Sequence, residues 1–290
     1  MSLELGLPAA ATRSTVRRLV SGSPSALFGG LVVGVILLVA IVSVFWTPYG
    51  PLTVSTGKEL LPPSAAHLMG TDEYGRDVLS RLMSGTDLTL LSSLGAVLIA
   101  GLVGVPAGLL AASRRGAVGE TIMRLADLVY SFPALLAAIT LVAAFGASTV
   151  TATVAIGVAS IPSFARVTRS AALPILASEY VQAARAYGRS PLAILRRHVL
   201  PNVAPFIIVQ VSLLLSVTVL AVAALSYLGL GTPPPTATWG GMLESAQSYL
   251  YQDPLLAIWP GLAIALSVLG FNALGDGLRD LLDPTLGGRA

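Results

Sequence analysis

The chain has 290 residues, of which 54% are apolar and 11% are charged, and its mean hydropathy is +0.82. A soluble globular protein spends about a quarter of its residues on charged side chains that solvate its surface, so this composition excludes an ordinary soluble enzyme and predicts a surface that faces lipid. The net charge of +3 gives no support to nucleic-acid binding, and the absence of cysteine excludes disulfides, thiolate metal sites and cysteine nucleophiles.

Six membrane spans are predicted, because a helix needs about 20 apolar residues to cross a bilayer. The run 128–165 is too long for one helix and is interrupted at Gly146, Ala147 and Ser148, so it is predicted to form a helical hairpin. We therefore expect an all-α, polytopic membrane protein with six transmembrane helices. The apolar runs are residues 26–46, 88–112, 128–165, 203–228 and 255–274.

The first span, residues 26–46, follows three arginines, an arrangement that a cleaved signal peptide also has. Its apolar stretch is longer than the roughly 7 to 15 residues of a signal peptide, and no small-residue cleavage site follows within residues 43–50. An uncleaved anchor is expected.

Orientation follows from the basic residues, which favour the cytoplasmic side of a membrane. With the N-terminus inside, only three of the 17 basic residues lie outside, namely Lys58, Arg76 and Arg81. We therefore expect a cytoplasmic N-terminal segment 1–25, an outer loop 47–87, a five-span core 88–290 with a large inner loop 166–202, and a cytoplasmic C-terminus. The inner basic residues are Arg13, Arg17, Arg18, Arg114, Arg115, Arg124, Arg166, Arg169, Arg185, Arg189, Arg196, Arg197, Arg279 and Arg289.

Several kinds of machinery are missing from the chain. No charge falls in the middle of a predicted span, which argues against an ion-coupled carrier. Asp127 and Arg124, at the inner mouth of the third span, are expected to form a structural helix-end pair, with a functional role as the alternative. The only lysine, Lys58, has no P-loop around it, so ATP would have to be hydrolysed by another chain. His67 and His198 fall on opposite sides of the membrane and cannot share a metal or catalytic site.

The inner loop contains two consecutive helix signals. The first helix begins after Ser178, whose hydroxyl is expected to cap it, carries Glu179 in its first turn and ends at Gly188. The second begins after Ser190 and is expected to stop before Pro201. Four apolar or small side chains at helical spacing lie on one face of the first helix, namely Tyr180, Ala183, Ala184 and Tyr187.

Such a face, with arginines around it, suits docking into the groove of a partner protein. A helix pair that lies passively on the membrane surface explains the same composition equally well. A DNA-binding helix-turn-helix is disfavoured, because spans on both sides tether the loop.

The residues of this loop resemble a known motif. Ala183–Ala184, Gly188 and Leu200–Pro201 have the spacing of the EAA motif in permease subunits of binding-protein-dependent ABC importers. The string EYVQAARAYGRSPLAILRRHVLPN is similar to the version in the dipeptide, oligopeptide and nickel branch. Gln182 replaces the usual glutamate and His198 the usual isoleucine, which removes a charge from the first position. The resemblance assigns ATPase coupling to Glu179, Gln182, Ala183, Ala184, Arg185, Gly188, His198, Leu200 and Pro201.

Three further strings extend this resemblance over most of the chain. GTDEYGRD at 70–77 resembles a signature of the C-type permease subunit, residues 228–240 resemble its outer loop, and residues 271–284, ending with Asp283–Pro284, resemble its C-terminal signature. Read locally, the first string is a capped turn that starts an amphipathic helix on the outer interface, and the prolines of the second form a stiff loop. The resemblance assigns the face that meets the binding protein to Gly231, Pro233, Pro234, Trp239 and Gly240.

The resemblance implies a type I ABC importer transmembrane fold and a permease subunit that translocates di- or oligopeptides across the plasma membrane. The implied partners are a second, related permease chain, two ATPase subunits or domains that bind ATP and Mg²⁺, and an extracytoplasmic solute-binding protein, with no cofactor in this chain. Nickel or another small solute is the alternative cargo, and a non-transporting scaffold or an autonomous carrier is the alternative of another class. Small polar residues are expected to line the pathway, namely Gln210, Ser212 and Ser216, although Gln210 can equally bond a neighbouring helix.

Overall fold

A computed structural model describes residues 24–114 and 116–282, and every regular element within these ranges is helical. Part of what the sequence predicts lies outside them, namely residues 1–23 of the N-terminal segment with Arg13, Arg17 and Arg18, then Arg115, Asp283–Pro284 and Arg289. The helices are α2 (Pro24–Phe45), α3 (Val78–Ser113), α4 (Ala117–Ser131), α5 (Ala134–Phe145), α6 (Thr149–Ala177), α7 (Glu179–Ala186), α8 (Pro191–Ile194), the π-helical turn η1 (Leu195–Val199), α9 (Leu200–Tyr227), α10 (Trp239–Ala246), the 3₁₀ turn η2 (Gln247–Tyr249) and α11 (Leu255–Leu282).

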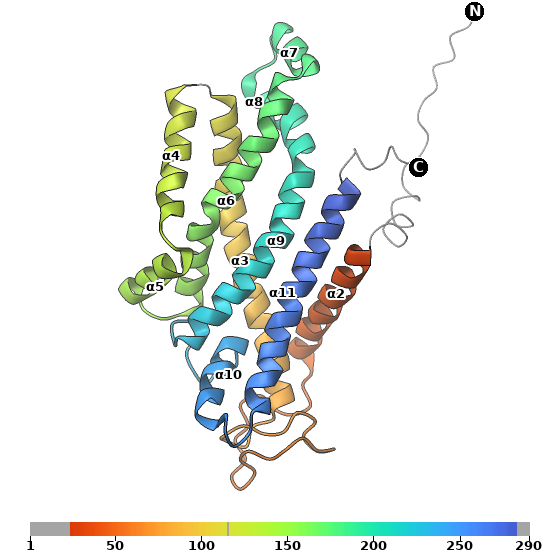
Figure 1. Cartoon of the computed structure of the whole chain (residues 1–290), viewed down its shortest axis with the longest axis vertical. Coiled ribbons are helices and arrows are strands. Elements are labelled where there is room, and N and C mark those ends of the chain that lie inside the picture. The colour runs from red at the N-terminus through yellow and green to blue at the C-terminus, as the bar shows by residue number, and fades with distance from the viewer. Residues whose placement is uncertain (1–23, 115, 283–290) are drawn as a thin grey trace, which may run out of the picture.

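The six-span architecture is confirmed when one broken helix pair counts as a single span. Five helical stretches of the described chain are long and apolar enough to cross a membrane: α2, α3, α6, the continuous run α8–η1–α9, and α11. The helices α4 and α5 pass the same test together but meet at a bend of 82°. Figure 1 shows the long helices side by side, with α5 turning away from α4 part of the way along the bundle.

The third span is the one that the sequence placed least well. It begins at Ala117 instead of residue 128, and it breaks after Ser131. Pro133 explains the break, because a proline disfavours helical geometry at the residue before it, and Phe132 has the extended angles φ −84° and ψ 132°. The predicted turn of the hairpin is confirmed, since Gly146 ends α5 with φ +90° and the Ser148 hydroxyl accepts from the amide of Thr151 at the start of α6.

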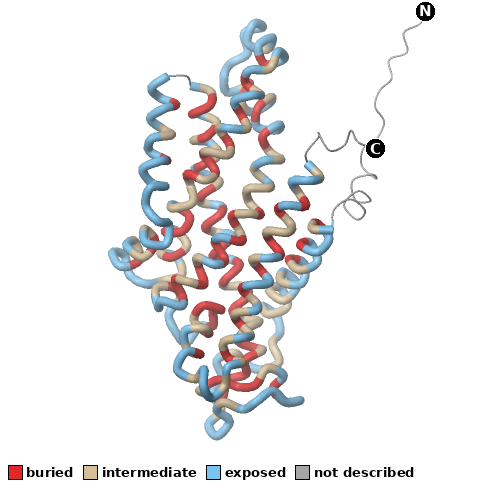
Figure 2. Tube along the Cα trace, in the orientation of Figure 1, coloured by how far each residue is buried: buried red, intermediate tan, exposed pale blue. Residues whose placement is uncertain are grey.

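Close backbone contacts hold the centre of the bundle together. A β-carbon added at Gly104 of α3 would lie 2.6 Å from the carbonyl oxygen of Ile161 on α6, and one at Gly108 would lie 2.5 Å from that of Ala165. Two glycines four residues apart therefore let α3 and α6 approach closely, as small residues do in membrane helices. Figure 2 shows buried residues concentrated between the long helices and exposed residues on the outward faces of α2 and α4.

The two ends of the bundle carry different structures. The inner end, named for the topology that the sequence predicts, holds α7, α8 and η1, which project beyond the other helices (Figure 1). The outer end holds the loop 46–77, the connection 228–238 and α10. The helix α3 begins at Val78, ten residues before the predicted start of the second span at residue 88, so part of the expected outer loop 47–87 is helical.

Candidate functional site

The inner segment, residues 178–202, contains the two short helices that the sequence predicts. Gly188 ends the first with φ +75°, and the amide of Arg189 bonds the carbonyl of Ala184 across the turn. A left-handed residue at this place favours glycine, because a β-carbon would crowd the following carbonyl. The Ser190 hydroxyl accepts from the amide of Ala193 at 3.4 Å, and Pro191 occupies the first helical position as expected.

The predicted cap at Ser178 is wrong. Its hydroxyl donates to the carbonyl of Ile175 at 2.6 Å and caps no amide of α7. The reason is that α6 continues to Ala177, only one residue before α7, so the serine hydroxyl bonds the end of the preceding helix.

The inner segment is attached to the bundle by apolar packing. Val181, Ile194 and Val199 are only 0–2% exposed, and they form a buried cluster with Ala172 and Leu176 of α6. The predicted face of α7 is therefore divided: Ala184 packs partly against this cluster, whereas Ala183, Tyr180 and Tyr187 point outward. The sequence missed Val181 because a single valine among exposed residues carries no periodicity.

The outward surface of the inner segment is polar and accessible. Glu179, Gln182, Arg185 and Gly188 are exposed, and the Gln182 amide makes a long 3.4 Å bond to the carbonyl of Leu176. Tyr187 is 89% exposed. The side chains to which the motif resemblance assigns coupling thus lie mostly on a free surface of this chain.

The second short helix does not stop before Pro201, contrary to expectation. The π turn η1, which contains Arg196, Arg197 and His198, leads directly into α9, with Leu200 and Pro201 in its first turn. Proline has no amide hydrogen to donate, and its steric effect on the preceding turn is absorbed by the wider π geometry. His198 remains tied to α9, because its carbonyl accepts from the Asn202 side chain at 2.7 Å. The inner segment is therefore continuous with a membrane span.

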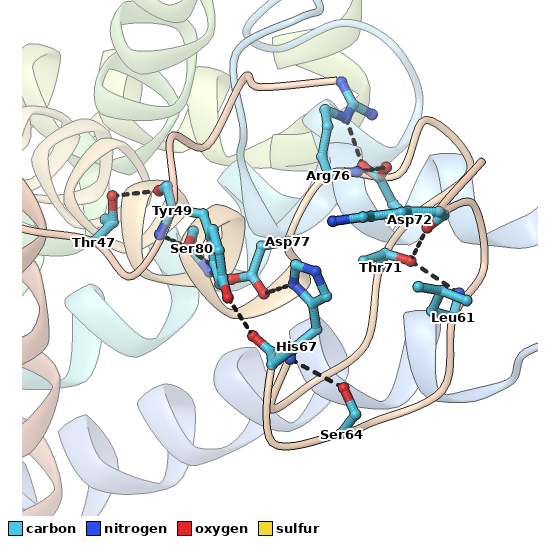
Figure 3. A network of polar contacts seen from close by, with 12 residues as sticks. Thr47, Tyr49, Leu61, Ser64, His67, Thr71, Asp72, Arg76, Asp77 and Ser80 are labelled. Atoms are coloured by element: carbon cyan, nitrogen blue, oxygen red, sulfur yellow. Dashed lines mark hydrogen bonds and ion pairs between the residues drawn. The ribbon is translucent and has the colours of Figure 1, made fainter. Parts of the chain in front are cut away.

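The outer cap, residues 46–77 with α10, is built around two buried aspartates (Figure 3). Asp77 caps α3, accepting from both the amide and the hydroxyl of Ser80 at 2.8 and 2.7 Å, and its other oxygen lies 2.9 Å from Nδ1 of His67. The predicted capped turn is thus confirmed, but it starts the long membrane-length helix α3, not an amphipathic helix on the interface.

Asp72 organises the GTDEYGRD turn. It accepts from the amides of Tyr74 and Arg76 at 2.9 Å, and from Nε of Arg76 at 2.6 Å, while Nε of Arg81 lies 3.3 Å away. The Arg76 guanidinium lies 4.4 Å from the centre of the Tyr74 ring. Burial is the main cause that raises the pKa of the neighbouring Glu73, an effect reinforced by the charge of Asp72 and opposed by Arg76 and Arg81.

The connection 228–238 faces this turn across a cavity of about 620 Å³, lined among others by Tyr74, Arg76, Pro234 and Glu244. Pro233 and Pro234 are exposed, and Gly231 is buried. Trp239 is only 2% exposed and its Nε1 donates to the carbonyl of Leu82, while Gly240 packs against α9. Of the five residues that the motif resemblance assigned to the outer face, Gly231, Trp239 and Gly240 are therefore buried in this chain and attach the loop to the bundle, and only Pro233 and Pro234 are exposed.

The residues expected to line the pathway are all bonded within the chain. The Gln210 amide donates to Ser163 on α6 at 2.7 Å, which is the interhelical bond that the sequence left open. Ser212 and Ser216 are buried; the first bonds the carbonyl of Ile208 at 3.5 Å, and the second donates to Leu213 and to the Asn272 side chain. Two of the three therefore pack inside this chain.

The sequence missed one charged pair. Arg166 donates to Asp127 at 2.7 Å, whereas Arg124 bonds Glu120 at 2.6 Å, so the predicted Asp127–Arg124 pair is wrong. Arg166 was expected in the inner loop, but α6 continues to Ala177 and places it well inside the helix. The sequence predicts no charge in the middle of a span, and α6 carries Arg166 because this helix continues past the predicted end of the span at residue 165. No local pattern could reveal a pair separated by 39 residues.

Three comparisons relate the chain to known proteins. Residues 104–288 match the family described as "Binding-protein-dependent transport system inner membrane component". The chain is 38% identical to the probable D,D-dipeptide transport system permease protein DdpC of Escherichia coli K12, covering 93% of this chain and 91% of that one. It is 42% identical to the di/tripeptide transport system permease protein DppC of Pseudomonas aeruginosa, covering 90% and 88%, respectively.

A permease named for glutathione transport and a solved transporter structure are also similar to the chain. The glutathione transport system permease protein GsiD of Pectobacterium atrosepticum is 42% identical over 77% of this chain and 74% of that one. A chain of the inward-facing MetNI methionine ABC transporter superposes with a TM-score of 0.59 at 19% identity, covering 70% of this chain and 96% of that one. This last likeness shows a shared fold.

Proposed function

We propose that this chain translocates di- or oligopeptides. The chain belongs to the family of binding-protein-dependent transport system inner membrane components, and it is the permease subunit of an ABC importer. The support is that relatives aligned over most of both chains are named for dipeptides, di/tripeptides and glutathione. Nickel or another small solute is the second candidate, favoured only by the branch that the inner motif resembles.

The inner segment is the proposed contact with the ATPases. The observation that carries this proposal is its construction: Val181 attaches it to the bundle, Gly188 forms its turn, and Ala183 and Tyr187 point outward. Closure of an ATPase dimer would push on this outward surface. Because η1 continues into α9 without a break, the displacement would pass directly into a membrane span.

The remaining parts of the importer are supplied by other chains. A related second permease would complete the pathway, and two ATPase subunits or domains would bind ATP and Mg²⁺ and carry out the hydrolysis, since this chain contains no P-loop. Both termini and the inner segment would lie in the cytoplasm of a cell whose plasma membrane holds the complex.

An extracytoplasmic binding protein would deliver the solute at the outer end. The exposed prolines Pro233 and Pro234, beside the outer cavity, are the proposed contact surface, and the buried Trp239 and Gly240 hold that surface in place. The binding protein would release its solute into a pathway that ATP binding opens outward and that returns inward after hydrolysis.

The first experiment is purification from the native membrane in mild detergent through a C-terminal tag, combined with an assay of ATP hydrolysis. Co-purification of a second permease and P-loop ATPases in near-equal amounts is expected. Isolation of this chain alone, without hydrolysis under several detergents, would favour a scaffold or an autonomous carrier.

A cross-linking experiment tests the contact itself, because the chain has no native cysteine. Ala183→Cys, on the exposed side of α7, is expected to cross-link to an ATPase subunit in the intact complex. Ala193→Cys, which is partly buried in the same segment, serves as the matched control and should react less. Equal failure of both variants in a complex that hydrolyses ATP would exclude this contact.

A further inference from the structure

Asp127 of α4 and Arg166 of α6 form an ion pair between two helices of the bundle. Arg166 donates to Asp127 at 2.7 Å, and its guanidinium lies 4.1 Å from the centre of the Tyr130 ring. The two charged side chains are 40% and 61% exposed, respectively. Neither is used in the packing of the core.

Counted from the outer end of α6, the pair lies toward the inner boundary of a bilayer core that begins at that end. Arg166 follows Thr149, the outer end of α6, by 17 residues, or about 25 Å at 1.5 Å per residue, which is less than the roughly 30 Å of a hydrocarbon core. A charged side chain exposed to lipid at such depth costs roughly 2.5 to 3.5 kcal/mol at the centre and less toward the surface. This cost favours water or protein over lipid as the surroundings of the two charges.

Other polar groups continue the same face. Ser163 precedes Arg166 by three residues and accepts from the Gln210 amide of α9, and Tyr130 follows Asp127 by three. We call this set of five residues, Asp127, Tyr130, Ser163, Arg166 and Gln210, the polar stripe.

The pair is set among exposed apolar side chains of α4, including Leu125 at 58% and Leu128 at 60% exposure, and the described residues of α2 on the other side of the bundle expose apolar side chains without an ion pair that compares with it. The exposed side chains of α2 are apolar, including Leu31 at 69%, Leu38 at 60% and Ile41 at 59% exposure. Such a surface suits lipid.

We propose that Asp127 and Arg166 form a subsite for zwitterionic solutes, in which Asp127 accepts the ammonium group and Arg166 holds the carboxylate. This inference rests on the proposed function. A guanidinium matches a carboxylate with two parallel hydrogen bonds. Dipeptides, tripeptides and glutathione all carry a free ammonium and a free carboxylate group.

The empty site needs no counter-ion, because the two side chains neutralise each other. A bound zwitterion replaces that pair with two new ones, so the net charge of the pathway does not change. Such an exchange keeps binding weak, as a transport step requires, since each new pair forms at the expense of the 2.7 Å bond. The ring of Tyr130 and the bonded amide of Gln210 supply neutral surfaces beside the charges.

Uptake by the complete reconstituted complex tests the charges. Asp127→Asn and Arg166→Gln are each expected to lower ATP-dependent uptake of radiolabelled alanyl-alanine at least tenfold, while assembly and ATP hydrolysis remain. The control is the pair Glu120→Gln and Arg124→Gln on the same helix, whose members are 61% and 77% exposed and should have no effect. Exchanging the two charges, Asp127→Arg with Arg166→Asp, is expected not to restore uptake; full restoration would show a purely structural pair and overturn the subsite.

Thiol labelling gives a second readout that does not depend on folding of the charge variants. Ser163→Cys, otherwise carrying the native sequence, should react with a membrane-impermeant thiol reagent, and alanyl-alanine should protect it while N-acetyl-alanine amide does not. Leu38→Cys on α2 should not react. An unreactive Cys at position 163, or equal protection by the neutral probe, would refute the subsite.

The two proposals fail in different ways. If the unmodified complex takes up no peptide, the proposed cargo is wrong, and the labelling experiment still decides whether a zwitterion binds the polar stripe. If the unmodified complex takes up peptide and the charge variants do so equally well, only the subsite is wrong.

Discussion

The two ends of this permease are held together by opposite kinds of interaction. In the outer cap and the adjoining first turn of α3, four charged side chains are less than 9% exposed and bond one another or nearby backbone, namely Asp72, Arg76, Asp77 and Arg81. In the inner segment the buried side chains are apolar, and its charged residues form no ion pair with any other described residue.

This difference separates a fixed end from a movable one. Directional bonds between buried charges tolerate little displacement, because each broken bond leaves a polar group without a partner. Apolar packing has no preferred direction, so a short helix attached through Val181 can shift as a unit. The polar groups of the inner segment then stay available for another protein.

The largest expected effect comes from breaking the outer cap. Asp77→Ala removes the cap of α3 and leaves the buried groups of His67 and Ser80 without their acceptor, so we expect a loss of roughly 2 to 4 kcal/mol in the free energy of unfolding. Unfolding in mixed micelles measures it. Glu120→Ala, from an exposed pair, should change the free energy by less than about 1 kcal/mol; a similar loss in both variants would contradict the comparison.

A smaller effect is expected from the apolar attachment of the inner segment. Val181→Ala removes two buried methyl groups and leaves a cavity, so that about 2 kcal/mol of local stability is lost. Hydrogen exchange of residues 178–199 should become faster while that of residues 70–80 is unchanged. Tyr187→Ala, at a side chain that is 89% exposed, should change neither.

Substitution of Gly188 in the turn of the inner segment should affect uptake strongly and stability only modestly. Gly188→Val places a β-branched residue at φ +75°, at a cost of about 1 to 2 kcal/mol, and uptake should be abolished while the chain remains inserted. Gly57→Val introduces the same strain at φ +79° in the outer loop, also with open space around it. Normal uptake by the Gly188 variant, or equal loss in both, would show that the inner turn has no special role.

The smallest expected effect is the pH dependence of stability that the buried carboxyl of Glu73 gives to the outer cap. Because burial raises the folded-state pKa of Glu73 above its ordinary value of 4.5, the contribution of this carboxyl to stability is fully present below that value and is lost as the pH rises through the folded-state pKa. Glu73→Gln should remove the part of the pH dependence that this carboxyl contributes. Thermal unfolding between pH 4 and pH 7 measures it, and an unchanged pH profile would contradict the shift.

Much of the molecule follows from the sequence alone, because the signals are local. Apolar runs of sufficient length predict the spans, and Gly146 and Gly188 mark turns where both glycines have positive φ. The motif spacing around Ala183, Gly188 and Pro201 predicts the family. These features depend on covalent geometry and on the transfer of contiguous apolar residues, neither of which needs a tertiary contact.

The tertiary structure decided the rest, since the contacts involved join residues far apart in the chain. Asp127 meets Arg166 across two helices, Trp239 reaches the carbonyl of Leu82, and Val181 packs on α6. Whether a charge faces a neighbour or a tryptophan is buried depends on which helices are adjacent. That arrangement comes from the close approach at Gly104 and Gly108 and from the break at Pro133.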